Sequence, residues 1–338
     1  MTLTRKTSAC LAIAVVAIVA GLASPAAATT AGGDGRVGFH YDDGLWQVSA
    51  GSDPEPIPGT AGGSHPEWSP DGQSLLFVQD GYLRIRDMAS GDVATVPGVD
   101  VANSAAWSPD GERAIVSLSV AGQLPSLWTV DVDGENLVRL ASAGPCSQAG
   151  LRAPSWSPDG EHYAFLNNAL KTDECSHTKP AVVVREFNSR ERLPLGRTLG
   201  SFMDEVNAPA IYEADFSDDG SQLLVRGEGD QFRAFSARVD IPGRAIAYAT
   251  FHGYLCVRDG DCLHAYQPTP SGGTAEIISS LTNDDEPRAS AVLRVSGAVV
   301  STYYDPNVYQ DNDEVGFNWL AADQIDVQPL PQSSLPDL

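Results

Sequence analysis

The sequence predicts an all-β chain that repeats one four-stranded antiparallel unit. The first observation is a short motif, Trp-Ser-Pro-Asp-Gly, at residues 68–72, 107–111 and 156–160, with a degenerate copy, Phe-Ser-Asp-Asp-Gly, at 216–220. The second is that an apolar, strand-forming run follows each copy. The third is the spacing of 39, 49 and 60 residues between copies. A repeat of about 40 residues with four strands is typical of a β-propeller blade. We therefore expect a single propeller, with seven blades favoured and six as the alternative.

The repeated motif has the composition of a hairpin corner. Proline presets φ near −65° at the first corner of a turn, and aspartate can hydrogen-bond its own backbone. Glycine adopts the left-handed conformation that closes a short loop. We expect each motif to join the first and second strands of its unit.

The longer pattern Pro-x-Trp-Ser-Pro-Asp-Gly, at residues 66–72 and 154–160, resembles the repeat of TolB-type β-propellers, which are similar in shape to WD-type repeats. The resemblance is specific for three units, weaker at 216–220, and limited to the propeller. It implies six blades, the usual number in that family. It also implies a scaffold that contacts partner proteins in the cell envelope.

The N-terminal 28 residues have the pattern of a secretory signal peptide. Arg5 and Lys6 precede an apolar run over residues 11–23, and Ala26-Ala27-Ala28 is a small-residue cleavage site. A retained anchor is the alternative, but the run is shorter than the 18 or more residues of a membrane span. We expect residues 29–338 to be the mature propeller domain, secreted or otherwise extracytoplasmic, without a membrane span.

The chain is strongly acidic, with 21 basic and 44 acidic side chains and a formal charge of −23. Loss of Arg5 and Lys6 leaves 19 basic side chains and a charge of −25. Such a surface repels nucleic acid and anionic lipid, so we expect no nucleic-acid partner. Cations, basic proteins and neutral sugars remain as ligands, and the charge also favours solubility as a monomer.

The first unit is incomplete. Two strand-like runs flank Asp42-Asp43-Gly44 from Arg36 onward, without a corner motif ahead of them. Because propellers often close their ring with strands from both chain ends, we expect the C-terminal segment to supply the missing strand.

The later units follow in order. Units two to five begin near Ser64, Asn103, Arg152 and Tyr212. A sixth unit is expected from the runs 253–257, 262–266 and 274–278, with the first two forming a hairpin across Asp259-Gly260. A seventh is expected from 291–295, 298–303 and 315–320.

Four cysteines remain after the signal peptide, and an even number in an exported protein favours disulfides. Cys146 lies in the loop that enters the fourth unit, and Cys175 lies between its second and third strands. Both loops reach the same face of a propeller, so this pair can form. Cys256 and Cys262 would meet across the Asp259-Gly260 hairpin. A four-cysteine metal site is disfavoured because close paired spacing is missing.

The turns divide between two faces of the expected ring. The corner motifs fall on one face and the long loops, at 141–151, 167–179, 200–211, 281–287 and 304–314, on the other. We call these the corner face and the long-loop face, and we expect binding at the long-loop face. Residues just ahead of the innermost strands should surround the channel mouth and bind a polar ligand or a peptide terminus, unless they are solvated loop ends: His65, Asn103, Arg152, Glu213 and Arg288.

Two acidic clusters lie on the long-loop face, at residues 283–286 and 305–314. Their oxygens are ligands that Ca²⁺ prefers, and the weak candidates are Asp305, Asn307, Asp311 and Asp313. The spacing does not match a calcium loop and the bend glycine is missing. We expect no cofactor, with calcium as the one possibility.

The sequence favours a binding protein over an enzyme. TolB-type repeats also form the propeller of prolyl-oligopeptidase-like peptidases, but the Gly-x-Ser-x-Gly elbow of their hydrolase domain is absent. Phosphate-loop, dinucleotide and paired-histidine zinc motifs are also absent. We expect a secreted, non-catalytic scaffold that binds a protein or cell-envelope ligand. The alternative is a propeller enzyme or carbohydrate-binding module that acts on extracellular polysaccharide, since carboxylate pairs can serve glycoside chemistry.

Overall fold

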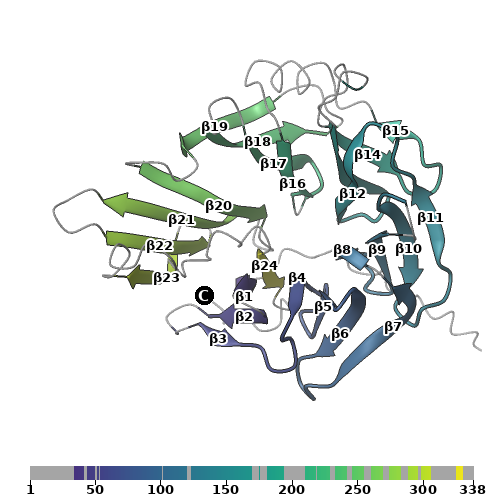
Figure 1. Ribbon diagram of the computed structural model, residues 1–338, viewed down its shortest axis with the longest axis horizontal. Helices are drawn as coiled ribbons and strands as arrows, with labels where there is room; N and C mark the ends of the chain where they lie inside the picture. Colours follow the sequence, from purple (N-terminus) through teal and green to yellow (C-terminus); the bar gives the residue numbers. More distant parts are fainter. Residues whose placement is uncertain are drawn as a thin grey trace, which may run out of the picture.

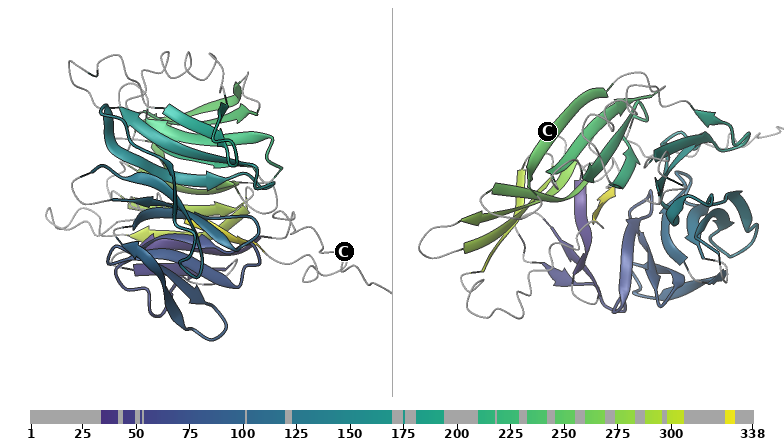
Figure 2. Two further views of the ribbon diagram at one scale, coloured as in Figure 1. Left: turned by 90° about the vertical axis from the view of Figure 1, so that its right-hand side faces the viewer. Right: turned by 45° about the horizontal axis from the view of Figure 1, so that its top comes forward.

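The computed structural model describes residues 34–329, with gaps at 42–43, 50–51, 53, 101, 120–122, 170–174, 176–180, 194–209, 218, 229–232, 242–245, 255–259, 269–273, 283–287, 296–297 and 306–324. From residue 246 onward, only the backbone is described. The described strands form six four-stranded antiparallel sheets around a ring (Figure 1). Figure 2 shows from the side that the strands run between the two faces of this ring. Turns and loops therefore fall on one face or the other. In the described part of the chain, no helix is long and apolar enough to cross a membrane.

Three sheets come from the first half of the chain and the C-terminal strand. The first sheet has the order β24 (Ile325–Pro329), β1 (Asp34–Tyr41), β2 (Gly44–Val48), β3 (Glu55–Pro56). The second consists of β4 (Gly63–Trp68), β5 (Ser74–Gln79), β6 (Tyr82–Asp87) and β7 (Val93–Asp100). The third consists of β8 (Ala102–Trp107), β9 (Arg113–Leu118), β10 (Ser126–Asp131) and β11 (Val138–Ala141).

The other three sheets follow in chain order. The fourth consists of β12 (Ser147–Trp156), β13 (His162–Ala169), β14 (Ala181–Glu186) and β15 (Arg192–Leu193). The fifth consists of β16 (Ala210–Phe216), β17 (Gln222–Glu228), β18 (Arg233–Asp240) and β19 (Ile246–Tyr254). The sixth consists of β20 (Gly260–Pro268), β21 (Thr274–Thr282), β22 (Arg288–Val295) and β23 (Ala298–Asp305).

The expectation of seven blades is wrong. Strand β19 is the outer strand of the fifth sheet, and β20 to β23 together make the sixth. Two complete units were expected after residue 250. Instead, this part of the chain supplies the outer strand of the fifth sheet and all four strands of the sixth. Corner motifs are missing here, so strand runs alone did not mark where one sheet ends. The expected strand at 315–320 lies outside the described residues.

The two chain ends meet in the first sheet, as the incomplete first unit predicted. Strand β24 pairs antiparallel with β1, and Val327 lies opposite Val37 while Ile325 lies opposite Phe39. Val37 and Phe39 are buried in the core. The ring is therefore closed by a strand from the C-terminal part of the chain, which confirms that prediction.

Each corner motif is stabilised by the same hydrogen bonds. In the first copy, the Ser69 hydroxyl donates to Asp71 Oδ1 over 2.6 Å, and the same hydroxyl oxygen accepts the backbone N–H of Ser74 over 2.8 Å. Asp71 Oδ1 also accepts the Gln73 N–H over 3.0 Å. Gly72 has a φ of 68° and donates its N–H to the Ser69 carbonyl. The three later corners repeat this arrangement. The predicted roles of aspartate and glycine in the turn are confirmed. The serine hydroxyl, which links the aspartate carboxylate to the backbone of the next strand, was not predicted.

The hydrophobic core lies between neighbouring sheets. One cluster of buried side chains joins the second and third sheets, and includes Leu76, Val116 and Val130. Similar clusters join the third to the fourth and the fourth to the fifth sheet. At the corner face, the indole Nε1 of Trp107 donates to the Glu67 carbonyl of the preceding sheet over 3.1 Å. Each sheet therefore buries its faces only by packing against its neighbours.

Candidate functional site

The innermost strands of five sheets share one irregularity. The strand register shifts between Ser64 and Glu67 in β4, between Ala102 and Ser104 in β8, between Arg152 and Ser155 in β12, between Ile211 and Glu213 in β16, and between Leu263 and Ala265 in β20. In each, the innermost strand has one residue more than its partner. β-Bulges of this kind redirect side chains and recur near functional sites. Because these five strands surround the centre of the propeller (Figure 1), we call the five bulges together the ring of bulges.

Three of the predicted channel-mouth residues lie at these bulges and are accessible to a ligand. His65 is half-buried with a φ of 54°, and its Nδ1 lies 3.2 Å from the Ser64 hydroxyl. Asn103 is exposed and donates from Nδ2 to the Ser117 carbonyl over 3.3 Å and to the Ser119 hydroxyl over 3.1 Å. Arg152 is half-buried. The structure thus brings these side chains to corresponding positions of three neighbouring sheets.

Glu213 also lies at a bulge, but it is engaged by a neighbouring strand. It is 8% exposed, and its carboxylate accepts two hydrogen bonds from Arg226 of β17, from Nε over 2.8 Å and from Nη2 over 2.9 Å. Arg226 is itself 4% exposed and lies over the Tyr212 ring, 5.2 Å from its centre. Because the Glu213 carboxylate is held inside the protein, it does not line the channel mouth as an open ligand-binding group.

Arg288 is not at the start of an innermost strand. It begins β22, the third strand of the sixth sheet counted from β20, where it lies opposite Thr282. The bulged residue of the innermost strand β20 is His264. His264 was not among the predicted residues, because residues 262–266 were expected to form the second strand of a hairpin. In the sequence, His264 is a polar residue that follows Leu263 within an apolar run, and this pattern could have indicated it.

One of the two predicted disulfides is present. Cys146 and Cys175 are bonded, with their Cα atoms 5.5 Å apart, at the face where the loop topology placed them. Gly253 and Tyr254 of the predicted hairpin belong to β19, which pairs with β18, while β20 pairs with β21 of the next sheet. Cys256 itself lies outside the described residues, so this second bridge stays a prediction.

The calcium candidates are largely beyond the described part of the chain. Asp305 ends β23, while Asn307, Asp311 and Asp313 lie outside the described residues, as does the cluster at 283–286. A different group is described at the corner of the fourth sheet, where ligand atoms of Asp159, Glu161 and His162 lie within 4.8 Å of one another. Asp159 Oδ1 already accepts the Ser157 hydroxyl and the Glu161 N–H. The Asp159 carboxylate of this group therefore stabilises the corner turn.

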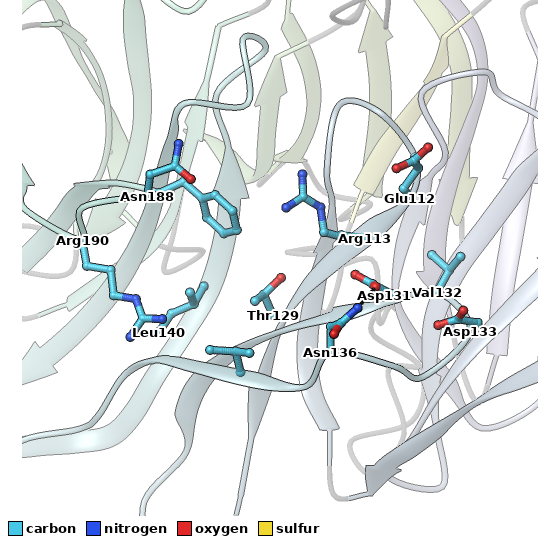
Figure 3. A pocket seen from close by; sticks show the side chains of 13 residues that line it. Glu112, Arg113, Thr129, Asp131, Val132, Asp133, Asn136, Leu140, Asn188 and Arg190 are labelled. Atoms are coloured by element: carbon cyan, nitrogen blue, oxygen red, sulfur yellow. Dashed lines mark hydrogen bonds between the residues drawn. The ribbon is translucent and has the colours of Figure 1, made fainter.

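A cavity of about 790 Å³ opens on the corner face, opposite the face predicted to bind. It lies between the third and fourth sheets and is formed by three turns: the β8–β9 corner, the β10–β11 turn and the β14–β15 turn (Figure 3). Its volume lies within the roughly 300–1,000 Å³ of small-molecule sites. The cavity was not predicted from the sequence, because tight turns in adjacent units do not indicate how much space lies between them.

Comparison with known proteins shows similarity in fold. No family model matches the chain, and no curated protein matches it in sequence. The structure is similar to TolB from Acinetobacter baumannii, with a TM-score of 0.55, 14% identity, and coverage of 80% of this chain and 66% of that chain. It is similar to a putative TolB from Agrobacterium tumefaciens, with a TM-score of 0.54, 17% identity, and coverage of 89% and 100%. A chain of a nidogen/laminin complex gives a TM-score of 0.55, 12% identity, and coverage of 80% and 93%.

These similarities agree with the repeat pattern in the sequence. The Trp-Ser-Pro-Asp-Gly corners suggested a TolB-type propeller, and the TolB structures match most of this chain in three dimensions. At such low identity the likeness concerns the fold and not the activity. The resemblance inferred from the repeat is thereby confirmed, and the chain is a β-propeller similar in structure to TolB.

Proposed function

We propose that this protein is a secreted, non-catalytic scaffold that binds a protein or another cell-envelope component through the long-loop face of its propeller. The observation that carries the proposal is the ring of bulges in the innermost strands. The bulges set His65, Asn103 and Arg152 at corresponding positions of neighbouring sheets. A partner that covers the channel mouth would meet these side chains together.

The fold neighbours support a protein ligand. TolB and a chain of a nidogen/laminin complex share this propeller architecture, and the latter was solved with a protein partner. The disulfide between Cys146 and Cys175 supports an oxidising, extracytoplasmic location. The high acidity of the chain disfavours nucleic acid and anionic lipid as the ligand.

Affinity capture with the mature chain, residues 29–338, tests the proposal. The bait is incubated with culture supernatant and envelope extract, and bound proteins are identified by mass spectrometry. The bait variant Arg152→Glu reverses a charge at the channel mouth, and Arg190→Glu makes the same change on the corner face. We expect one partner to be retained by wild type and by Arg190→Glu, and to be lost or weakened at least tenfold with Arg152→Glu.

Two results would contradict the proposal. One is a partner that Arg190→Glu loses and Arg152→Glu retains, because binding would then use the corner face. The other is turnover of an extracellular polysaccharide or peptide that disappears in His65→Ala, because the protein would then be an enzyme.

A further inference from the structure

The cavity on the corner face has two chemically different walls. The wall from the third sheet carries the carboxylates of Glu112, Asp131 and Asp133, and the wall from the fourth sheet carries Asn188 and Arg190 (Figure 3). Acceptors therefore face donors across the space. The cavity lies on the opposite face from the channel mouth, so it is a separate site.

Arg113 lies between the two walls and is fixed there. Its guanidinium lies over the Phe187 ring, 5.2 Å from the centre, and donates to Asp110 Oδ2 over 3.1 Å. The ring of Phe187 packs in turn on Trp156, with 4.6 Å between ring centres. Because these groups hold one another, the cavity wall is preorganised, which lowers the entropic cost of binding a ligand.

The floor contains a buried hydroxyl that the protein does not satisfy. Thr129 lines the cavity and is 8% exposed, and its Oγ1 has no hydrogen-bond partner among the described residues. A buried polar group without a partner is unfavourable. Oγ1 is covered in the free protein. A rotation about χ1 that turned it toward the cavity would let a ligand hydroxyl pair with it and remove this cost, so the site favours a ligand with hydroxyl groups.

The charges of the lining select against ionic ligands. Three carboxylates and two guanidinium groups give the lining a formal charge of −1, and the Arg113 guanidinium already has the Asp110 carboxylate as a partner. An anion would meet the carboxylate wall and the strongly negative protein as a whole. A cation would meet Arg190 and Arg113. A neutral ligand whose hydroxyls both donate and accept can use both walls, while Val138 and Leu140 provide apolar surface for its C–H groups.

We propose that this corner-face cavity binds a short neutral oligosaccharide. The hydroxyl on Thr129 contacts a sugar hydroxyl at the floor, and Arg190 and Asn188 donate to sugar oxygens from the fourth-sheet wall. The site is independent of partner binding at the long-loop face. A propeller with both sites would hold a glycan and a protein on opposite faces.

The test uses the mature chain and a panel of neutral trisaccharides built from glucose, mannose, galactose or N-acetylglucosamine. Binding is measured by saturation-transfer NMR and titration calorimetry with wild type, Thr129→Val and Arg190→Ala. Arg192→Ala is the matched control, because Arg192 is an exposed arginine of the same sheet that does not line the cavity. We expect at least one trisaccharide to bind wild type and Arg192→Ala equally. The two cavity variants should each weaken that binding about three- to tenfold, the effect of one lost hydrogen bond.

The thermal stability of Thr129→Val separates binding from folding. Valine keeps the shape of threonine and removes the buried hydroxyl, so its Tm should equal or exceed that of wild type while its affinity falls. If the variant folds poorly, Arg190→Ala carries the test, since Arg190 is exposed. The proposal is overturned if no trisaccharide binds, or if both cavity variants retain full affinity. It is also overturned if a peptide of alternating lysine and glutamate binds in place of the sugars and is lost in the same variants.

Discussion

Glu213 and Arg226 form a buried, two-point ion pair between the neighbouring strands β16 and β17, with the nitrogen–oxygen pairs 2.8 and 2.9 Å apart. Both side chains are at least nine-tenths buried. The pair lies at the bulge of an innermost strand, which is where the sequence suggested a ligand-binding carboxylate. The geometry makes it part of the internal structure of the fifth sheet.

Removing one partner of this pair should destabilise the protein strongly. Arg226→Met leaves the Glu213 carboxylate buried without its guanidinium, and we expect the free energy of unfolding in urea to fall by about 3–5 kcal/mol. The double variant Glu213→Gln with Arg226→Met removes both charges and should recover most of that loss. A single variant as stable as wild type would show that the pair does not hold the two strands.

The Cys146–Cys175 bridge should stabilise the fourth sheet through the unfolded state. The two cysteines are 29 residues apart, and closing a loop of this length contributes about 3–4 kcal/mol in the chain-entropy model. Cys146→Ser with Cys175→Ser should lower the free energy of unfolding by up to that amount. Peptide mapping without reduction should recover the two cysteines linked in wild type. Free thiols at both positions in secreted protein would refute the bridge.

The corner of the third sheet should make stability depend on pH in acid. Partial burial raises the pKa of Asp110, but hydrogen bonds from Ser108, the Glu112 N–H and Arg113 outweigh it, and the pKa lies below its ordinary value. A carboxyl whose pKa is lower in the folded state stabilises fully above its unfolded pKa, near 4. That stabilisation is lost as the pH falls through the lower, folded value.

Replacement of this carboxylate gives the corresponding measurement. Asp110→Asn should lower the free energy of unfolding by about 1 kcal/mol at neutral pH, and its difference from wild type should shrink below about pH 4. Urea titrations between neutral and acid pH measure both effects. Glu191→Gln, an exposed carboxylate change in the β14–β15 turn, is the control. A difference for Asp110→Asn that does not change with pH would contradict the explanation.

Closure of the ring should depend on β24. A chain truncated after residue 324 lacks the strand that pairs with β1, so Val37 and Phe39 lose the backbone that lies beside them. Exposing a buried side chain of this size costs about 1.5–3 kcal/mol, and the backbone pairing is lost as well. We expect a large fall in Tm, with the N-terminal strands becoming sensitive to protease. A chain truncated after residue 330 keeps β24 and should retain the Tm of wild type. Equal stability of the two truncated chains would show that β24 does not close the ring.

Much of the fold could be predicted because the interactions that form its hairpins are made between residues close together in the sequence. Ser69, Asp71 and Gly72 make the first corner through hydrogen bonds within six residues, so each copy of the motif marks a hairpin wherever it occurs. The pairing of Cys146 with Cys175 followed from the order of strands within one sheet. Strand boundaries were less certain after residue 250, where corners are absent and β19 was assigned to the wrong sheet.

The candidate sites were predicted less completely, because they depend on contacts between segments. His65, Asn103 and Arg152 were predicted from their positions just ahead of the expected innermost strands, and the structure places them at bulges. The same reasoning gave Glu213, whose partner Arg226 lies on the next strand. It failed for the sixth sheet, where no corner motif marks the innermost strand and the bulged residue is His264.

The sequence by itself determined the repeating hairpin, the propeller architecture and the closing of the ring by both chain ends, because turn chemistry and alternating strand patterns act over a few residues. Only the tertiary structure decided the grouping of strands into six sheets, the burial of Glu213 against Arg226, and the cavity between the third and fourth sheets. These features depend on how neighbouring sheets pack and which side chains they bring together across space. The spacing of residues along the chain does not predict that packing.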